Sequence, residues 1–205
     1  MTAFTRVQRA LGVATLGALL LTACGNDDDM SGMDHGSGGS SNSKADSNKA
    51  DSSGTFNDAD VTFAQMMVPH HQQALEMAEL ADGRASDAQL KDIVAKIEKA
   101  QEPEIRTLTG WLKSWKQPTA MEHTMPGMMP GMMSAKDMDE LTAMKGAEFD
   151  KMFAEMMIDH HNGAISMAKD EQKNGKHADA MKMAGDIATG QSAEVKQLQG
   201  ILDRL

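Results

Sequence analysis

The sequence predicts an all-α protein, a four-helix bundle built from two repeated helical hairpins. Residues 63–78 and 153–168 are nearly alike: each reads Phe-Ala-x-Met-Met-x-x-His-His and continues with Ala and Met-Ala at the same spacing. The same ninety-residue shift aligns residues 101–112 with 191–202. No segment alternates with a period of two and tyrosine is absent, so strands are not expected. Two hairpins from one duplication most simply form a bundle with pseudo-two-fold symmetry.

The first repeat is predicted to contain two helices joined by a glycine-containing turn. The first helix should begin near Asn57 or Asp58, because both residue types are good N-caps. Pro69 is expected to kink this helix or to restart it. The second helix should run from Ser86 to about Trp115.

The second repeat is preceded by a short helix of its own. Ser134 is a suitable N-cap for this helix, which should end near Lys145, before Gly146. Two long helices over about 147–173 and 178–203 then complete the repeat. The predicted organisation is a signal peptide (1–23), a flexible tether (24–56), hairpin repeat 1 (57–116), a methionine-rich loop (117–134) and hairpin repeat 2 (135–205).

The amino terminus has the pattern of an export signal. Arg6 and Arg9 precede an apolar run over residues 11–21, which is too short and too weakly flanked for a transmembrane helix. Residues 21–24 read Leu-Thr-Ala-Cys and resemble a bacterial lipobox, so we expect Cys24 to be lipidated. The protein would then be exported and anchored to the outer face of the cell membrane.

The charge of the chain restricts its partners. The formal net charge is −10, and removing the signal would remove Arg6 and Arg9 and make the charge more negative. Such an acidic chain argues against binding to nucleic acid and is compatible with binding to cations. Cys24 is the only cysteine, so an intramolecular disulfide is excluded.

A helical wheel places the histidines of the motif on different faces. At about 100° per residue, His70 lies near the centre of an inward-facing stripe, while His71 lies on its flank. His160 and His161 take the same positions in the second repeat. We therefore expect His71 and His161 to flank the central pair, either supporting its ligands or lying at the surface.

The following helix of each repeat has polar residues within its apolar stripe. Gln101 and Glu104 lie in that stripe in repeat 1, and Gln191 and Glu194 lie in it in repeat 2. Because a buried carboxylate without a partner is costly, we expect both glutamates to approach His70 and His160 across the bundle, with the glutamines nearby.

This polar layer has two competing interpretations. Histidine–glutamate hydrogen bonds could fix the register of the helices without any ligand, and methionine at helical spacing is often only core filler. The repeated conjunction of histidine and methionine favours a metal site, and thioether sulfur favours Cu(I). The candidate ligands are His70, His71, His160, His161, Met66, Met67, Met77, Met156, Met157, Met167, Glu104 and Glu194.

The loop between the repeats is a second candidate site. Seven methionines and histidines fall within residues 121–133, among prolines and glycines that prevent a regular helix. This composition predicts a loop that collects copper, unless its methionines are incidental to a linker. Its candidate ligands are Met121, His123, Met125, Met128, Met129, Met132 and Met133, and a weak site in the tether could use Met30, Met33 and His35.

The duplicated Met-Met-x-x-His-His motif, with Gln-x-x-Glu in the following helix and a Met-Pro-Gly-Met-Met loop, resembles the bacterial family catalogued as domain of unknown function 305. The resemblance covers roughly residues 57–204. It implies a ferritin-like four-helix bundle in an exported or membrane-anchored protein, with a link to copper binding and copper tolerance. It directs attention to the methionines and histidines of both motifs.

These observations predict an extracytoplasmic, lipid-anchored protein that binds copper for sequestration, tolerance or delivery, and that is not an enzyme. A copper-handling partner protein and a homo-oligomer are both compatible with this prediction. One alternative is a ferritin-like redox enzyme, although the Glu-x-x-His pairs of di-iron centres and the His-Glu-x-x-His zinc motif are absent. Another is a metal-free interaction module of the cell envelope.

Overall fold

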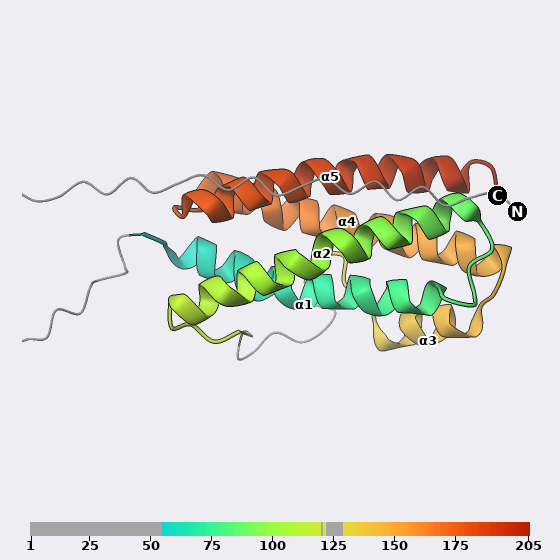
Figure 1. Cartoon of the computed structure of the whole chain (residues 1–205), viewed down its shortest axis with the longest axis horizontal. Coiled ribbons are helices and arrows are strands. Elements are labelled where there is room, and N and C mark those ends of the chain that lie inside the picture. Colours follow the sequence, from blue (N-terminus) through green and yellow to red (C-terminus); the bar gives the residue numbers. More distant parts are fainter. Residues whose placement is uncertain (1–54, 120, 122–128) are drawn as a thin grey trace, which may run out of the picture. The chain divides into compact units, whose positions relative to one another are not determined.

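The computed structural model describes residues 55–119, 121 and 129–205. These residues form five helices and no strand, which confirms the all-α prediction. Figure 1 shows four long helices lying side by side, with one short helix packed at one end. The helices are α1 (Asp58–Ala81), α2 (Ala88–Ser114), α3 (Ala135–Ala143), α4 (Ala147–Asn174) and α5 (Ala178–Leu202).

Side-chain caps determine where α1 and α3 begin. Asn57 accepts the backbone N–H groups of Ala59 and Asp60, and the Asp60 carboxylate accepts the N–H of Asn57 in return. Ser134 and Asp137 make the same reciprocal capping box at the start of α3. Each box satisfies backbone donors that have no partner within the helix.

Two predicted boundaries differ from the structure. The N-cap of α2 is Asp87 and not Ser86, because Asp87 accepts the Leu90 N–H while Ser86 is held by another helix. The short helix α3 ends at Ala143, before Lys145.

α1 is continuous across Pro69, so it does not restart there. Proline removes only one hydrogen bond of the helix, and the buried packing on both sides of Pro69 can offset that loss.

Two buried aspartates join the hairpins to each other. Asp60, in the first turn of α1, accepts the backbone N–H groups of Lys176 and His177 in the turn between α4 and α5, at 2.8–3.2 Å. Asp150, its equivalent after the ninety-residue shift, accepts those of Ser86 and Asp87 between α1 and α2, at 2.8–3.2 Å. The Ser86 hydroxyl also donates to Asp150. The pseudo-two-fold relation is therefore built into hydrogen bonds at both ends of the bundle.

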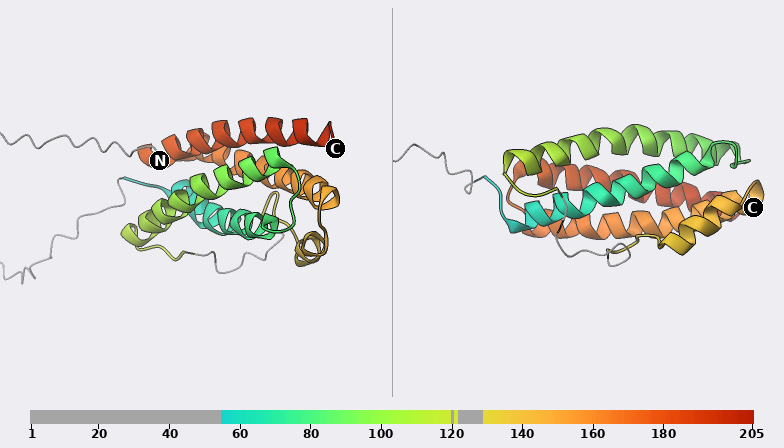
Figure 2. Two further views of the ribbon diagram at one scale, coloured as in Figure 1. Left: turned by 45° about the vertical axis from the view of Figure 1, so that its right-hand side comes forward. Right: turned by 90° about the horizontal axis from the view of Figure 1, so that it is seen from below.

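The two hairpins meet mainly along α1 and α4. Figures 1 and 2 show α1 paired with α2 and α4 paired with α5, and α1 also packs against α4. The short helix α3 contacts both α1 and α4 near the turn between α1 and α2. The interface between α1 and α4 is thus the place where the two copies of the motif face each other.

The apolar core is divided into two clusters, one toward each end of the bundle. One contains Phe149 and Phe153 of α4 together with Leu141 of α3, and the other contains Phe63, Leu108 and Leu112. The histidines of both motifs, with Gln101 and Gln191, are buried but belong to neither cluster. A polar layer therefore separates the two halves of the core.

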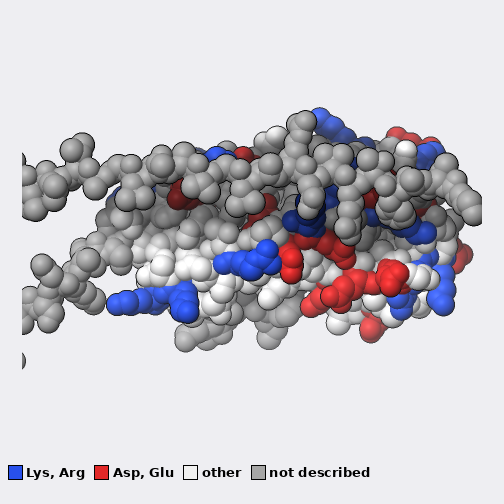
Figure 3. All heavy atoms as spheres, viewed as in Figure 1, with Lys and Arg blue, Asp and Glu red and all other residues white. Residues whose placement is uncertain are grey.

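The described surface is charged. On the face seen in Figure 3, acidic side chains gather toward the turn between α1 and α2, interspersed with lysine and arginine. Leu205 is the only large hydrophobic residue exposed in the described part of the chain. None of the described helices is long and apolar enough to cross a membrane.

Candidate metal centre

His70 of α1 and His160 of α4 meet at the centre of the polar layer. Their imidazole rings are in contact, with centroids 3.7 Å apart and planes tilted by 39°. Both side chains are fully buried. The ninety-residue repeat therefore brings the same residue of each motif to one point on the pseudo-two-fold axis.

Both of these imidazoles are neutral at pH 7. Burial, together with the neighbouring charge of His71, lowers the pKa of His70 to about 3, although its hydrogen bond to Pro130 acts in the opposite direction. Burial and the proximity of His70, His161 and His71 hold the pKa of His160 well below its usual value. A neutral imidazole has a free nitrogen lone pair, which is the form that binds metals.

The two glutamates bind the other pair of histidines. Nε2 of His71 lies 2.7 Å from Oε2 of Glu104, and Nε2 of His161 lies 2.7 Å from Oε2 of Glu194. The prediction that these carboxylates approach His70 and His160 is therefore wrong. Successive helical residues point about 100° apart, so the second histidine of each motif faces its own hairpin partner while the first faces the other repeat.

His71 and His161 are also more buried than the wheel predicts. Both are fully buried, whereas 23% of the Glu104 side chain and 15% of the Glu194 side chain are exposed. The second helix of each hairpin covers the flank of the first, so the flanking position becomes interior. The flanking position therefore holds, but a surface position is wrong for both histidines.

Hydrogen-bond partners fix the tautomer of three of the four histidines. His70 Nε2 lies 3.1 Å from the carbonyl oxygen of Pro130, and the carboxylates of Glu104 and Glu194 face Nε2 of His71 and His161. Carbonyl and carboxylate oxygens accept hydrogen bonds, so each Nε2 carries the proton. In the neutral ring of His70 this leaves the lone pair on Nδ1, and metal-binding histidines are usually oriented in this way.

Several buried polar atoms in this layer have no hydrogen-bond partner among the described residues. They are Nδ1 of all four histidines, Nε2 of His160, both amide atoms of Gln101 and Oε1 of Gln191. Burying such groups without a partner is costly, and a metal ion would use the nitrogen lone pairs. No group of three or more His, Cys, Asp or Glu side chains suited to a metal ion occurs in the described residues. The His70–His160 pair is therefore the central candidate for binding a metal ion.

The carboxyl end of the loop covers His70. The Gln73 amide donates to the Met133 carbonyl oxygen at 2.9 Å and accepts the Met133 N–H at 2.7 Å. On the other side, Gly163 of α4 lies so close to Pro130 that a Cβ atom there would clash with the Pro130 carbonyl group. Gly131, with φ +76°, has equally little room against α4. Sequence reasoning missed Gln73 and Gly163, although they occupy equivalent repeat positions and break the internal identity.

The predicted methionine ligands are distributed around the layer. Met67 lies in the core cluster with Phe63 and Met66 packs against it, while the cluster with Phe149 includes Met77, Met156 and Met157. Met167 is buried in the Phe63 cluster. In the loop Met129 is buried, and Met121, Met132 and Met133 are half-buried. The predicted positions Cys24, Met30, Met33, His35, His123, Met125 and Met128 lie outside the described residues.

The sequence profile described as "Domain of unknown function (DUF305)" matches residues 60–202. The chain belongs to this family. Two solved DUF305 structures are similar to it: a secreted protein described as putative, from Streptomyces coelicolor, and a fragment from Deinococcus radiodurans. The Streptomyces protein is 28% identical, and the match covers 71% of this chain and 92% of that protein. The Deinococcus fragment is 27% identical, and the match covers 73% of this chain and 98% of the fragment. Both have a TM-score of 0.67.

A third similar structure is CopM in its Cu(II)-bound form. It is 36% identical, with a TM-score of 0.61, and the match covers 70% of this chain and 95% of CopM. CopM is also solved in Cu(I)-bound and silver-bound forms. No curated protein matches the chain. The DUF305 fold is thus shared with a protein whose structures contain copper.

Proposed function

We propose that this DUF305 protein binds copper in the polar layer, outside the cytoplasm, and stores it or passes it on. The observation that carries the proposal is the contact between the neutral imidazoles of His70 and His160, which are buried with unpartnered nitrogen atoms. The likeness to CopM supports copper as the metal.

The four histidines have different roles in this proposal. His70 and His160 are the central ligands. His71 and His161, each held by a glutamate through Nε2, have a buried Nδ1 without a partner and would be further ligands. A bound metal ion would supply a Lewis acid that accepts these lone pairs. Met77, Met156 and Met157 are left to apolar packing.

Soft thioether groups favour Cu(I) over Cu(II). The methionines of the loop over residues 117–134 would collect Cu(I) from solution. Lipidation of Cys24 would hold the protein on the outer face of the cell membrane through the tether over residues 24–56. Copper collection by the loop and anchoring through Cys24 are both parts of this proposal.

The central test is competition for Cu(I) between the protein and a chromophoric chelator. The double variant His70→Gln/His160→Gln should bind Cu(I) at least about 100-fold more weakly than the wild type, since it removes both central ligands. The matched control is His177→Asn, which removes a histidine outside the layer and retains an N-cap residue at the start of α5. Equal affinity in wild type and double variant would contradict the proposal.

A metal-free module is the second candidate, because the two histidine–glutamate bonds hold α1 to α2 and α4 to α5 and so could serve only to set helix register. In that case copper would not change the melting temperature of the wild type. Exchange of His71 or His161 would lower stability without any effect on metal content.

A further inference from the structure

The groove between α1 and α4 differs at its two ends, although the duplication relates them. At one end α3 packs over the groove: Leu141 is fully buried in the core cluster with Phe149, and the Arg84 guanidinium donates to the Thr142 carbonyl oxygen at 3.1 Å. At the other end no described helix lies over the groove, and a pocket of about 520 Å³ is present. One copy of a duplicated groove is thus sealed and the other is open.

The residues of the open end differ in charge from their repeat equivalents. Asp170 lines the pocket, whereas the equivalent residue at the sealed end is Leu80. Glu171 lines it at the position of Ala81, but its pKa, raised by burial to about 8, keeps it largely protonated at pH 7, so Asp58 and Asp170 are the acidic side chains of the rim. Asn174 lines the pocket at the position of Arg84, the residue that holds α3. The lining contains acidic residues and no lysine or arginine. The open end is therefore suited to a cation.

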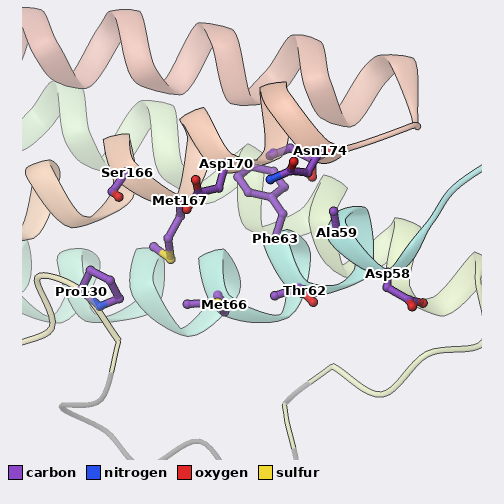
Figure 4. Close-up of a pocket in the computed structure, with 11 residues that line it drawn as sticks. Asp58, Ala59, Thr62, Phe63, Met66, Pro130, Ser166, Met167, Asp170 and Asn174 are labelled. Atoms are coloured by element: carbon purple, nitrogen blue, oxygen red, sulfur yellow. The ribbon is translucent and has the colours of Figure 1, made fainter.

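Thioether groups lie on both walls of the pocket. Met66 comes from α1 and Met167 from α4, and Figure 4 shows the Met167 side chain directed from α4 toward α1. Pro130 stands at one end of the pocket and Asp58 toward the other. The pocket thus combines soft ligands with an acidic rim.

The pocket adjoins the metal centre. Pro130 lines it and accepts the hydrogen bond from His70 Nε2 at 3.1 Å. Met66 lies one helical turn before His70 on the same face of α1. A cation held between Met66 and Met167 would therefore lie beside the segment that covers the central histidines.

We propose that this pocket is the port through which Cu(I) reaches the histidine layer, with Met66 and Met167 as transient ligands and the carboxylates attracting the ion. The inference rests on the proposed function. Each step is a ligand exchange, from the donor to the thioether groups and from these to the imidazoles, so the copper stays Cu(I). The histidines determine how tightly copper is held, and the methionines determine how fast it arrives.

The test measures the rate and the equilibrium separately. Stopped-flow transfer of Cu(I) from a chromophoric chelator to the full chain gives the loading rate, and Ag(I) is a probe that does not change oxidation state. Met66→Leu/Met167→Leu should load at least about tenfold more slowly while the final affinity changes by less than about threefold. Met→Leu conserves volume, so the fold should be retained.

The duplication supplies the matched control. Met156 and Met77 are the repeat equivalents of Met66 and Met167, and they are buried beneath the sealed end. Met77→Leu/Met156→Leu should load at the wild-type rate. The proposal that Cu(I) enters through this pocket would be contradicted if Met66→Leu/Met167→Leu loaded at the wild-type rate, or if the control were slowed equally.

A second, independent experiment tests whether the acidic side chains at the rim of the pocket attract the ion. Asp58→Asn/Asp170→Asn should slow loading at low ionic strength, and the difference should shrink at high salt because the attraction is screened. Asp179→Asn, in the first turn of α5 and outside the pocket, should load normally. A rate independent of the two rim carboxylates at every salt concentration would contradict the electrostatic part.

Failure of the port and failure of the proposed function give different results. If the port alone is wrong, the wild type binds Cu(I), the histidine variant does not, and the variant of Met66 and Met167 loads normally. If copper binding itself is wrong, the histidine variant equals the wild type at equilibrium, and the port falls with it.

Discussion

Gln73 and Gly163 occupy equivalent positions in the two repeats and act on the same loop in opposite ways. Gln73 holds the loop to α1 through both hydrogen bonds of the Met133 backbone, and Gly163 makes room for Pro130 against α4. The difference lets one asymmetric loop cover a nearly symmetric pair of histidines. Four predictions follow from this region and from the packing around it.

Adding a single methyl group to Gly163 should displace the loop. In Gly163→Ala the new Cβ would clash with the Pro130 carbonyl group and lie 2.9 Å from the Cα of Gly131. We expect a loss of about 1–3 kcal/mol in the free energy of unfolding, measured by denaturant titration. Gly190→Ala is the control: nothing lies within 4 Å of its Cβ, so it should stabilise the protein by about 0.4–1 kcal/mol. Equal effects at the two sites would contradict the close packing of the loop.

Removing the Gln73 amide should free the loop while leaving the helices intact. Gln73→Ala loses two hydrogen bonds and should cost about 1–3 kcal/mol. Hydrogen exchange at the Met133 amide should become faster, because its N–H no longer has this acceptor. Gln89→Ala, at an exposed position, should change neither quantity. Unchanged protection at Met133 would show that Gln73 does not hold the loop.

Glu171 should make the protein less stable at alkaline pH. Burial, together with the hydrogen bond and the charge of Asp60, raises the pKa of Glu171 to about 8. A carboxyl whose pKa is raised by folding contributes full stability below its ordinary value of 4.5 and loses it as the pH rises toward about 8. Thermal unfolding between pH 5 and pH 9 should therefore show a falling midpoint.

Glu171→Gln tests the origin of this dependence. Glutamine keeps a donor for Asp60 and cannot ionise, so the variant should lose the alkaline decline and be more stable than the wild type at pH 9. Glu155→Gln, at an exposed position on the same helix, should retain the decline. A decline that persists in Glu171→Gln must come from another group.

The histidine pair should make the metal-free protein sensitive to acid. Folding lowers the pKa of His70 to about 3, so its contribution to stability is complete above the ordinary value of 6.5 and is lost as the pH falls toward 3. The slope can reach about 1.4 kcal/mol per pH unit for each proton taken up. Denaturant titrations between pH 7 and pH 4 should show a smaller slope in His70→Gln than in the wild type, with His177→Asn as the control. An unchanged slope would mean that His70 is already protonated in the folded state.

The repeat could be recognised in the sequence because it repeats chemistry as well as hydrophobicity. The ninety-residue shift predicted two helical hairpins, and Asn57 and Ser134 predicted where α1 and α3 begin, since capping depends on residues only a few positions away. The helical wheel also placed His70 and His160 in the interior, because a single helix determines which residues share its face.

The partners of those residues could not be predicted in the same way. The wheel assigned Glu104 and Glu194 to the wrong histidines because it contains no information on how far one helix is rotated against its neighbour. The sealing of one end by α3, the pocket at the other and the loop over His70 are likewise contacts between segments far apart in the chain.

The sequence by itself determined the helices, their duplication and the residues that form a polar layer, because each follows from local spacing along one chain. The tertiary structure alone decided which histidines face each other, which glutamates orient the rest, and which end of the duplicated groove stays open. Those outcomes depend on the packing of four helices and a loop at once, and a symmetric repeat becomes functionally asymmetric only through that packing.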